Sequence, residues 1–312
     1  MKYDIKTYRE EYLDDHARIE ADERNRWGVI ERPDKEQLKT NLARRYSQPD
    51  FDPETRLYAF KGDKIVGFIT SSIYEEDGII KGDLRIPFVV EGYEDARDPL
   101  LERAIEVLKT KGATSIRVMV SEYWGETVSV AKRNGFKFDK DIVIQSQKRF
   151  DEIDEKKLLE PKDVQNFDYQ KHADAVTKFL MKQYNVSEEE ARPIVDRYKD
   201  WEIGETKNPS GSPQRLVTHG LIIANEEVVG RLLGFQQEQS GEKTTDLSMY
   251  AKDNNKEILG QLLTAGIRES KKLGMEVLHI GIRDPTEEIK GFYSSYGLIF
   301  RTAAAYYTKE EL

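Results

Sequence analysis

The chain has 312 residues and no cysteine, which excludes disulfides, thiolate catalysis and cysteine metal sites. Charged residues make up 34% and hydrophobic residues 38% of it, and at this length we expect about two domains of ordinary size. The net charge of −9 argues against nucleic acid as a partner, because phosphate binding needs a cationic face. No apolar run is long enough to span a membrane and the N-terminus has no secretory signal pattern, so we expect a cytoplasmic protein with no membrane partner.

The first half of the chain alternates helical and strand patterns. In chain order, apolar periodicity predicts helices at 8–21 and 34–46, strands at 56–61, 64–74, 79–90 and 114–120, a helix at 125–134, and paired strands around 136–150. Before the strand at 114–120, Asp98-Pro99 opens another helix, which Gly112 ends. Asp is a good N-cap, and Pro is favoured at the first helical position.

A charged stretch separates this half from a second one. Nine of the thirteen residues from 151 to 163 are charged and Pro161 interrupts them, so we predict a linker at 151–165 between domains at 1–150 and 166–312. The second half then predicts helices at 170–184 and 187–201, strands at 216–224, 227–237 and 243–250, a helix at 255–272, a strand at 275–282, a helix at 285–296 and a strand at 302–308. Residues 202–215 form a flexible connector, either an ordinary surface loop or a lid.

Landmark residues indicate that the two halves repeat each other. Gly112 matches Gly274 at an offset of 162 positions, and further upstream Asp83 matches Asp246 at an offset of 163. A repeat of the same elements over so long a span is most simply a duplicated domain.

Several kinds of chemistry find no support in the sequence. The four histidines, His16, His172, His219 and His279, lie far apart and none has the His-Glu-x-x-His spacing, so we expect no metal site. His279 lies within an apolar strand, where a histidine is more often a core residue than a ligand or base. There is no Walker loop, no Gly-x-Ser-x-Gly elbow and no dinucleotide-binding glycine motif.

The order of elements and the sequence Gly291-Phe292-Tyr293-Ser294-Ser295-Tyr296-Gly297-Leu298 resemble the GNAT superfamily of N-acyltransferases, whose last helix commonly ends in Tyr-x-x-x-Gly-Phe. The resemblance covers both halves, as in tandem members such as the mycothiol synthases. It implies an α/β chain of two tandem GNAT-like domains, each a mixed, mostly antiparallel sheet flanked by helices. It also implies acetyl-CoA as the acyl donor, with its pyrophosphate at the junction between the fourth strand and the following helix.

By the same resemblance, a tyrosine protonates the departing CoA thiolate. Tyr293 has that position in the second half, whereas Ala131 has it in the first. A methyl group cannot donate a proton, so the second half is predicted to be catalytic and the first to be a degenerate partner. The alternative for Tyr293 is an aromatic residue that packs on the sheet.

The predicted phosphate junction departs from the family, because neither copy keeps the glycines of the Arg/Gln-x-x-Gly-x-Gly/Ala pattern. The matching positions are Asn254, Glu257 and Leu259 in the second half, and Gly92, Asp95 and Arg97 in the first. A carboxylate there would repel a phosphate, unless Glu257 points outward and suits the helix dipole. Cofactor binding is therefore expected only in the second half, at Met249, Tyr250, Ala251, Asn254, Asn255, Lys256, Glu257, Ile258 and Leu259.

Asp246 is the candidate general base, since it lies on the strand that would flank the acyl group. Asp83 matches it in the half that we expect to be inactive, which favours a structural role for both carboxylates. His219 and Glu238 are further candidates on neighbouring strands.

These expectations describe an acetyltransferase that acts on a small-molecule amine or a protein amine. Two alternatives stay open: a non-catalytic GNAT-like module that binds a small molecule or protein, and a transferase that takes its acyl group from charged tRNA. The net charge of −9 counts against the second alternative. The sequence leaves the acceptor, the acyl chain and the oligomeric state open.

Overall fold

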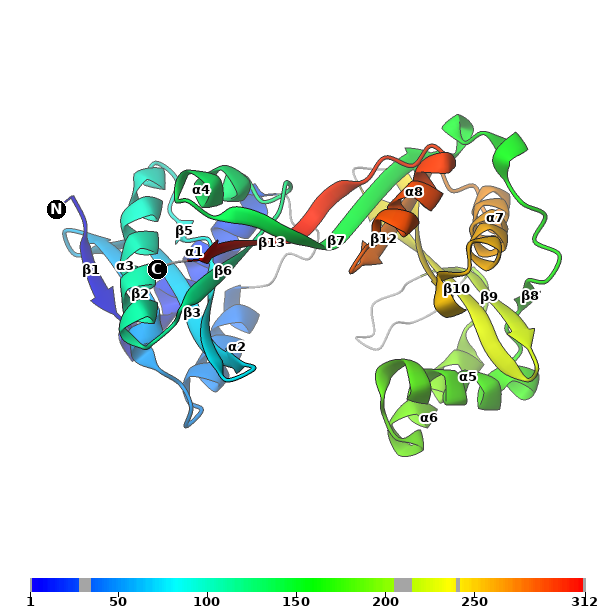
Figure 1. Ribbon diagram of the computed structural model, residues 1–312, viewed down its shortest axis with the longest axis horizontal. Helices are drawn as coiled ribbons and strands as arrows, with labels where there is room; N and C mark the ends of the chain where they lie inside the picture. The colour runs from blue at the N-terminus through cyan, green and yellow to red at the C-terminus, as the bar shows by residue number, and fades with distance from the viewer. Residues whose placement is uncertain (1, 28–34, 205–214, 240–241, 311–312) are drawn as a thin grey trace. The chain divides into compact units, whose positions relative to one another are not determined.

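A computed structural model describes residues 2–27, 35–204, 215–239 and 242–310 (Figure 1). The chain divides into two compact units, which we call unit 1 (1–143 and 302–312) and unit 2 (144–301). Within the described ranges, no helix is both long and apolar enough to cross a membrane.

Unit 1 is a mixed sheet between two helical layers. Its helices are α1 (Leu13–Arg26), α2 (Lys35–Tyr46), α3 (Arg97–Thr110) and α4 (Thr127–Arg133). Its strands are β1 (Asp4–Thr7), β2 (Arg56–Lys61), β3 (Lys64–Glu76), β4 (Ile79–Arg85), β5 (Phe88–Val89), β6 (Ser115–Val120), the first part of β7 (Lys137–Arg149) and β13 (Arg301–Glu310). The sheet order is β1-β2-β3-β4-β6-β13-β7, β5 pairs with β3, and β4 runs parallel to β6.

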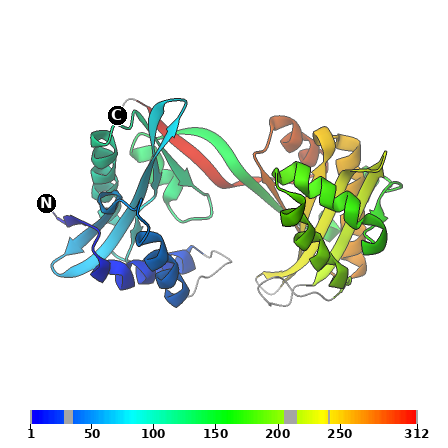
Figure 2. The same ribbon diagram turned by 90° about the horizontal axis from the view of Figure 1, so that it is seen from below.

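Both faces of the unit 1 sheet are buried, because successive residues of a strand point to opposite sides. Along β2, Leu57 and Ala59 pack in the cluster that contains the apolar stripe of α3, including Leu100. Tyr58 and Phe60 pack in the cluster on the other face, where α1 contributes Ile19. Figure 2 shows α3 on one side of this sheet and α1 on the other.

Unit 2 repeats this plan. Its helices are α5 (Tyr169–Tyr184), α6 (Glu188–Asp196), α7 (Lys256–Lys272) and α8 (Glu287–Ser295). Its strands are the second part of β7, β8 (Gln165–Asn166), β9 (Leu216–Ala224), β10 (Glu227–Gln239), β11 (Glu242–Ala251) and β12 (Val277–Arg283). The order is β7-β12-β11-β10-β9-β8, with β11 parallel to β12.

Helices also cover both faces of the unit 2 sheet (Figure 2). Leu232 and Leu247 face α7, and Leu221 faces α5 and α6. Gly266 lets α7 approach the sheet closely, because a Cβ at this position would lie 2.5 Å from Cδ1 of Leu247.

The last strand of each half is exchanged relative to the predicted domains. β13, which we placed in 166–312, pairs with β6 of unit 1 from Ala305 to Glu310. Residues from Ile144 onward, which we placed in the first domain, belong to unit 2, where β7 lies next to β12. The domain limits at 150 and 166 therefore differ from those of the compact units. The strand periodicity of β7 and β13 is compatible with pairing in either unit, so it could not set these limits.

The predicted linker is also part of unit 2. Phe150 and Ile153 are buried in the cluster that α7 covers. Farther along, the carboxylate of Glu160 accepts hydrogen bonds from Arg268 of α7 at 2.9 Å. The charge pattern predicted a linker, but the segment packs on unit 2 through Phe150 and Ile153, and the exposed Glu160 side chain pairs with Arg268 of α7.

Three local predictions need correction. The expected strand pair at 136–150 is the single strand β7. Helix α3 begins at Arg97 after a short 3₁₀ turn, so Asp98 is no N-cap, and its carboxylate accepts from Asn134 at 2.9 Å instead. Strand β1 was not predicted. Most of the predicted connector at 202–215 lies outside the described residues.

Candidate active site

The two parallel strands of unit 2 part at one edge. β11 pairs with β12 from Thr244–Val277 to Leu247–Ile280. Beyond Leu247, β11 stays paired with β10 up to Ala251. The sheet therefore opens at the carboxyl end of β12, beside the last residues of β11, and a site for a ligand at such a switch in pairing is common in α/β folds.

A carboxylate–imidazole pair lies next to this opening. Asp246 and His279 are opposite each other in the parallel register, and Nδ1 of His279 lies 2.9 Å from Oδ1 of Asp246. The Gln237 amide donates to the other carboxylate oxygen at 3.1 Å, and Nε2 of His279 lies 3.4 Å from the side-chain oxygen of Gln145. The Asp246 side chain is 37% exposed and that of His279 is 13% exposed, so the pair is accessible from the α5 side of the sheet.

The corresponding strands of unit 1 hold a different pair. Asp83 is opposite Arg117 in the register of β4 and β6, and Arg117 donates to its carboxylate at 2.9 Å. The Arg117 guanidinium lies over the rings of Tyr74 and Tyr306, at 4.5 and 4.3 Å from their centroids. An arginine stays protonated and cannot accept a proton, whereas an imidazole can. Only the unit 2 pair is thus suited to acid–base chemistry.

The start of α7 is capped by its own side chain. Asp253 and Asn254 are left-handed, with φ of 55° and 52°. The side chain of Asn255 then accepts from the backbone N–H groups of Glu257 and Ile258 at 3.0 and 3.1 Å. These are donors that a pyrophosphate at a helix N-terminus would use. A phosphate at α7 therefore competes with the Asn255 cap.

The other predicted cofactor residues have varied positions. Lys256 forms an exposed ion pair with Glu288 of α8 at 2.9 Å, which places the first turns of α7 and α8 together. Ala251 and Leu259 are buried in the α7 cluster, and Met249 is partly buried against it. Tyr250 faces the other way, where its ring meets that of Phe179 at 4.8 Å.

Tyr293 lies on the opposite face of the sheet from the Asp246–His279 pair. Its side chain packs in the α7 cluster, with ring centroids 5.0 Å from Phe292 and 5.8 Å from Phe300. Burial alone raises the pKa of Tyr293 above its usual value, so the hydroxyl stays protonated at neutral pH. Among the described residues, no hydrogen-bond partner satisfies this hydroxyl.

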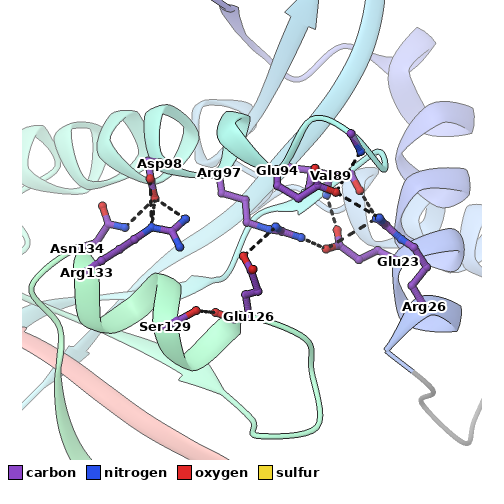
Figure 3. Close-up of polar contacts among 11 residues, drawn as sticks. Glu23, Arg26, Val89, Glu94, Arg97, Asp98, Glu126, Ser129, Arg133 and Asn134 are labelled. Carbon is purple, nitrogen blue, oxygen red and sulfur yellow. Dashed lines mark hydrogen bonds and ion pairs between the residues drawn. The ribbon is translucent and has the colours of Figure 1, made fainter.

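The start of α3 in unit 1 holds a buried carboxylate (Figure 3). Glu23 of α1 accepts hydrogen bonds from the Val89 N–H and from the Arg97 guanidinium. Its side chain is 1% exposed, and burial raises its pKa while Arg97 opposes the shift. Arg26 donates to the Val89 carbonyl at 2.6 Å and lies 3.6 Å from Glu94. This end of α3 is thus occupied by charges of unit 1 itself.

Sequence reasoning missed two of these groups. His279 was read as a core residue, although the repeat aligns it with Arg117, and that change of residue at an ion-pairing position was a signal. Glu23 had no signal, since its partners Val89 and Arg97 are more than 60 positions away. His219 is 4% exposed beneath the α5–α6 layer, far from solvent. Glu238 lies on β10, and its side chain is outside the described part.

The chain resembles solved structures of GNAT proteins over nearly its full length. A tandem GNAT protein from the clavulanic acid biosynthesis pathway is 12% identical, with 99% of this chain and 98% of that chain covered and a TM-score of 0.55. The glucosamine N-acetyltransferase region of a fungal multi-domain β-N-acetylglucosaminidase is 14% identical, with coverage of 98% and 38% and a TM-score of 0.54. A probable N-acyltransferase from Enterococcus faecalis is 8% identical, with coverage of 100% and 73% and a TM-score of 0.51. No family model and no curated protein matches the chain.

At these identities the likeness establishes the fold. The chain has the fold of tandem GNAT proteins, and the predicted fold class is confirmed.

Proposed function

We propose that this chain with a tandem GNAT fold transfers an acyl group from an acyl-CoA, such as acetyl-CoA, to an amine, and that unit 2 carries out the transfer. The observation that carries the proposal is the Asp246–His279 pair beside the opening between β11 and β12. Unit 1 has Asp83–Arg117 at the same place, which cannot act as a base.

In the proposed reaction, Asp246 accepts from Nδ1–H of His279, and Nε2 carries the lone pair once the acceptor amine replaces the Gln145 side-chain oxygen beside it. Nε2 accepts the proton that the acceptor amine loses as its nitrogen bonds to the thioester carbonyl carbon. The C–S bond breaks, and the Tyr293 hydroxyl gives a proton to the sulfur. Solvent returns a proton to Tyr293 and removes one from His279, so the protein ends unchanged.

The positions of these groups support this division of labour. Asp246 and His279 lie on the α5 face and Tyr293 on the α7 face, so base and acid approach the opening from opposite sides. The amine would attack an acyl group bound between the strands from one side, and the CoA thiolate would depart on the other side. The raised pKa of Tyr293 makes it a weak acid, so we expect its contribution to be smaller than that of the base.

A non-catalytic binding module is the second candidate, and the Asn255 cap favours it. Two N–H groups at the start of α7 are already used, and Glu257 adds a negative charge in that turn. Both features weaken the attraction for a pyrophosphate. In this case the chain would bind a small molecule or a protein without turnover.

The test is an assay of acyl transfer from acetyl-CoA to a panel of primary amines, in which the release of the CoA thiol is measured. Asp246→Asn keeps the shape of the side chain but removes its charge, so we expect kcat to fall by about 10² to 10⁴-fold with acetyl-CoA affinity unchanged. Asp83→Asn is the matched control in unit 1 and should leave kcat unaltered. An equal loss in both variants, or none in Asp246→Asn, would rule out the Asp246–His279 pair as the base.

Tyr293 needs a separate comparison. Tyr293→Phe removes only the hydroxyl, while the ring still packs with Phe292 and Phe300. We expect a lower single-turnover rate and unchanged thermal stability. Tyr296→Phe, at the C-cap of the same helix, is the control, because it also removes only a hydroxyl, and that hydroxyl lies near Gly260 of α7. An unchanged rate in Tyr293→Phe would assign this tyrosine to packing alone.

A further inference from the structure

We propose that unit 1 binds a small aromatic carboxylate in a pocket at the divergence of β4 and β6. This inference is independent of the acyl transfer proposed for unit 2. It concerns the other compact unit, and no residue of the Asp246–His279 pair takes part in it.

The pocket arises from a change of strand partner. β4 runs parallel to β6 from Lys81–Ser115 to Arg85–Met119. The chain then passes through Ile86 to Phe88, which pairs with β3 instead. The strands therefore separate beyond Arg85 and Met119, and α1 covers the gap with Arg24 and Trp27.

The walls of the pocket are apolar and flat. Its lining is Arg24, Trp27, Arg85, Ile86, Phe88, Met119, Trp124 and Thr127, around a cavity of about 40 Å³. The indoles of Trp27 and Trp124 are nearly parallel, at 15° and with centroids 6.3 Å apart, and Phe88 lies 5.2 Å from Trp27. A cavity of this size holds a few water molecules, so one edge of a ring enters it and the carboxylate stays at the mouth. Flat aromatic walls favour a flat ligand.

A glycine fixes the position of one wall. Gly125 has φ of +52°, and a Cβ there would lie 2.7 Å from Nε1 of Trp27. Any side chain at this position would push the indole away. The loop before α4 and the end of α1 are therefore matched to each other around the pocket.

The charges of the pocket favour an anion. Its lining contains two arginines and no acidic residue. Arg24 pairs with Glu20, yet its Nε is buried without a hydrogen-bond partner among the described residues. Within the same part of the chain, Arg85 has no hydrogen bond or ion pair. The carboxylates that act on its charge are Glu20 and Asp83, and Asp83 is already paired with Arg117. With Asp83 assigned to Arg117, the guanidinium groups of Arg24 and Arg85 against the carboxylate of Glu20 leave one positive charge. A monocarboxylate balances this charge with paired hydrogen bonds.

An acyl-CoA fits this pocket less well than a free acid. Its phosphates would extend toward the start of α3, where Glu23 already binds Arg97 and the Val89 N–H. Glu94 and Asp95 add two acidic side chains in the first turn before α3. Like charges there repel a pyrophosphate, whereas a monocarboxylate at Arg85 carries no phosphate.

The test is a titration of the full chain with benzoate, in which tryptophan fluorescence is recorded after each addition. Two of the three tryptophans line the pocket, so binding should change the emission and saturate. Benzamide has nearly the same shape without the charge, and we expect it to bind at least about tenfold more weakly. Equal affinity for the two compounds, or no saturable change with benzoate, would overturn the proposal.

Variants separate the pocket from unspecific quenching. The Arg85 side chain is exposed, so Arg85→Gln should fold normally and bind benzoate at least about tenfold more weakly, with benzamide unaffected. Arg103→Gln, in an exposed pair of α3, is the control and should leave the affinity unaltered. Acetyl-CoA should not displace benzoate. Displacement by acetyl-CoA, or equal affinities in Arg85→Gln and the unmutated chain, would contradict a carboxylate site in unit 1.

Discussion

His219→Phe should remove part of the acid sensitivity of unit 2. The His219 ring stacks on Phe167, at 4.3 Å and 11°, beneath the α5–α6 layer. Its two nitrogens are buried, and no described residue is hydrogen-bonded to either. Burial lowers the pKa of His219 well below 6.5, and the positive charge of Arg231 lowers it further. Phenylalanine keeps the stacking and loses no hydrogen bond.

The sign and size of the effect follow from proton binding. The unfolded chain protonates His219 near pH 6.5, whereas the folded chain does not until much lower pH. The contribution of the neutral His219 ring to the free energy of unfolding is therefore fully present above about pH 6.5. It is lost as the pH falls, because only the unfolded chain binds the proton. The loss is about 1.4 kcal/mol at pH 5.5 and about 2 kcal/mol at pH 5, as long as the folded form stays neutral.

Hydrogen exchange of β9 and β10 amides measures the opening free energy of unit 2 itself. We expect it to fall between pH 7 and pH 5 in the unmutated chain and to fall by about 2 kcal/mol less in His219→Phe. At pH 7 the variant should be as stable as the unmutated chain. An unchanged pH dependence, or a loss above about 1 kcal/mol at pH 7, would refute this account of a buried unpaired imidazole.

The remaining predictions concern the starts of α7 and α3. Asn255→Gly should tighten acetyl-CoA binding by up to about tenfold in calorimetric titration, because it frees the N–H groups of Glu257 and Ile258 at a small cost in helix stability. Asn255→Asp should weaken it, since the cap stays and gains a negative charge. Glu23→Gln should lower the stability of unit 1 by about 3 to 5 kcal/mol in urea unfolding, because Arg97 loses its buried partner. Asp98→Asn, in a more exposed pair, should change it little.

The sequence predicted most helices and the central strands because their signals are local. The stripe of Leu262, Leu263 and Ile267 defines α7, and its cap at Asn255 was among the residues expected at this junction. The exchange of β7 and β13 was not predictable in this way. Each strand is the last one of its half, and the two halves have the same pattern, so periodicity does not say which unit a strand joins. Only the three-dimensional pairing of Ala305 to Glu310 with β6 shows that β13 belongs to unit 1.

The candidate site shows the same limit. Asp246 was selected from its strand, but its role depended on His279, which lies 33 positions away and becomes a neighbour only through parallel pairing. Tyr293 was found through the family pattern, while its burial and raised pKa required the packed α8. Contacts made across strands are non-local, and a single sequence carries little information about them.

The most direct test of the account is hydrogen exchange of the full chain with and without acetyl-CoA. The junction of β11 and α7, residues 249–259, should become protected, and residues 89–99 at the start of α3 should not change. This result would place the acyl donor in unit 2, next to the Asp246–His279 pair. Protection at 89–99 alone, or at neither junction, would contradict acyl transfer by unit 2.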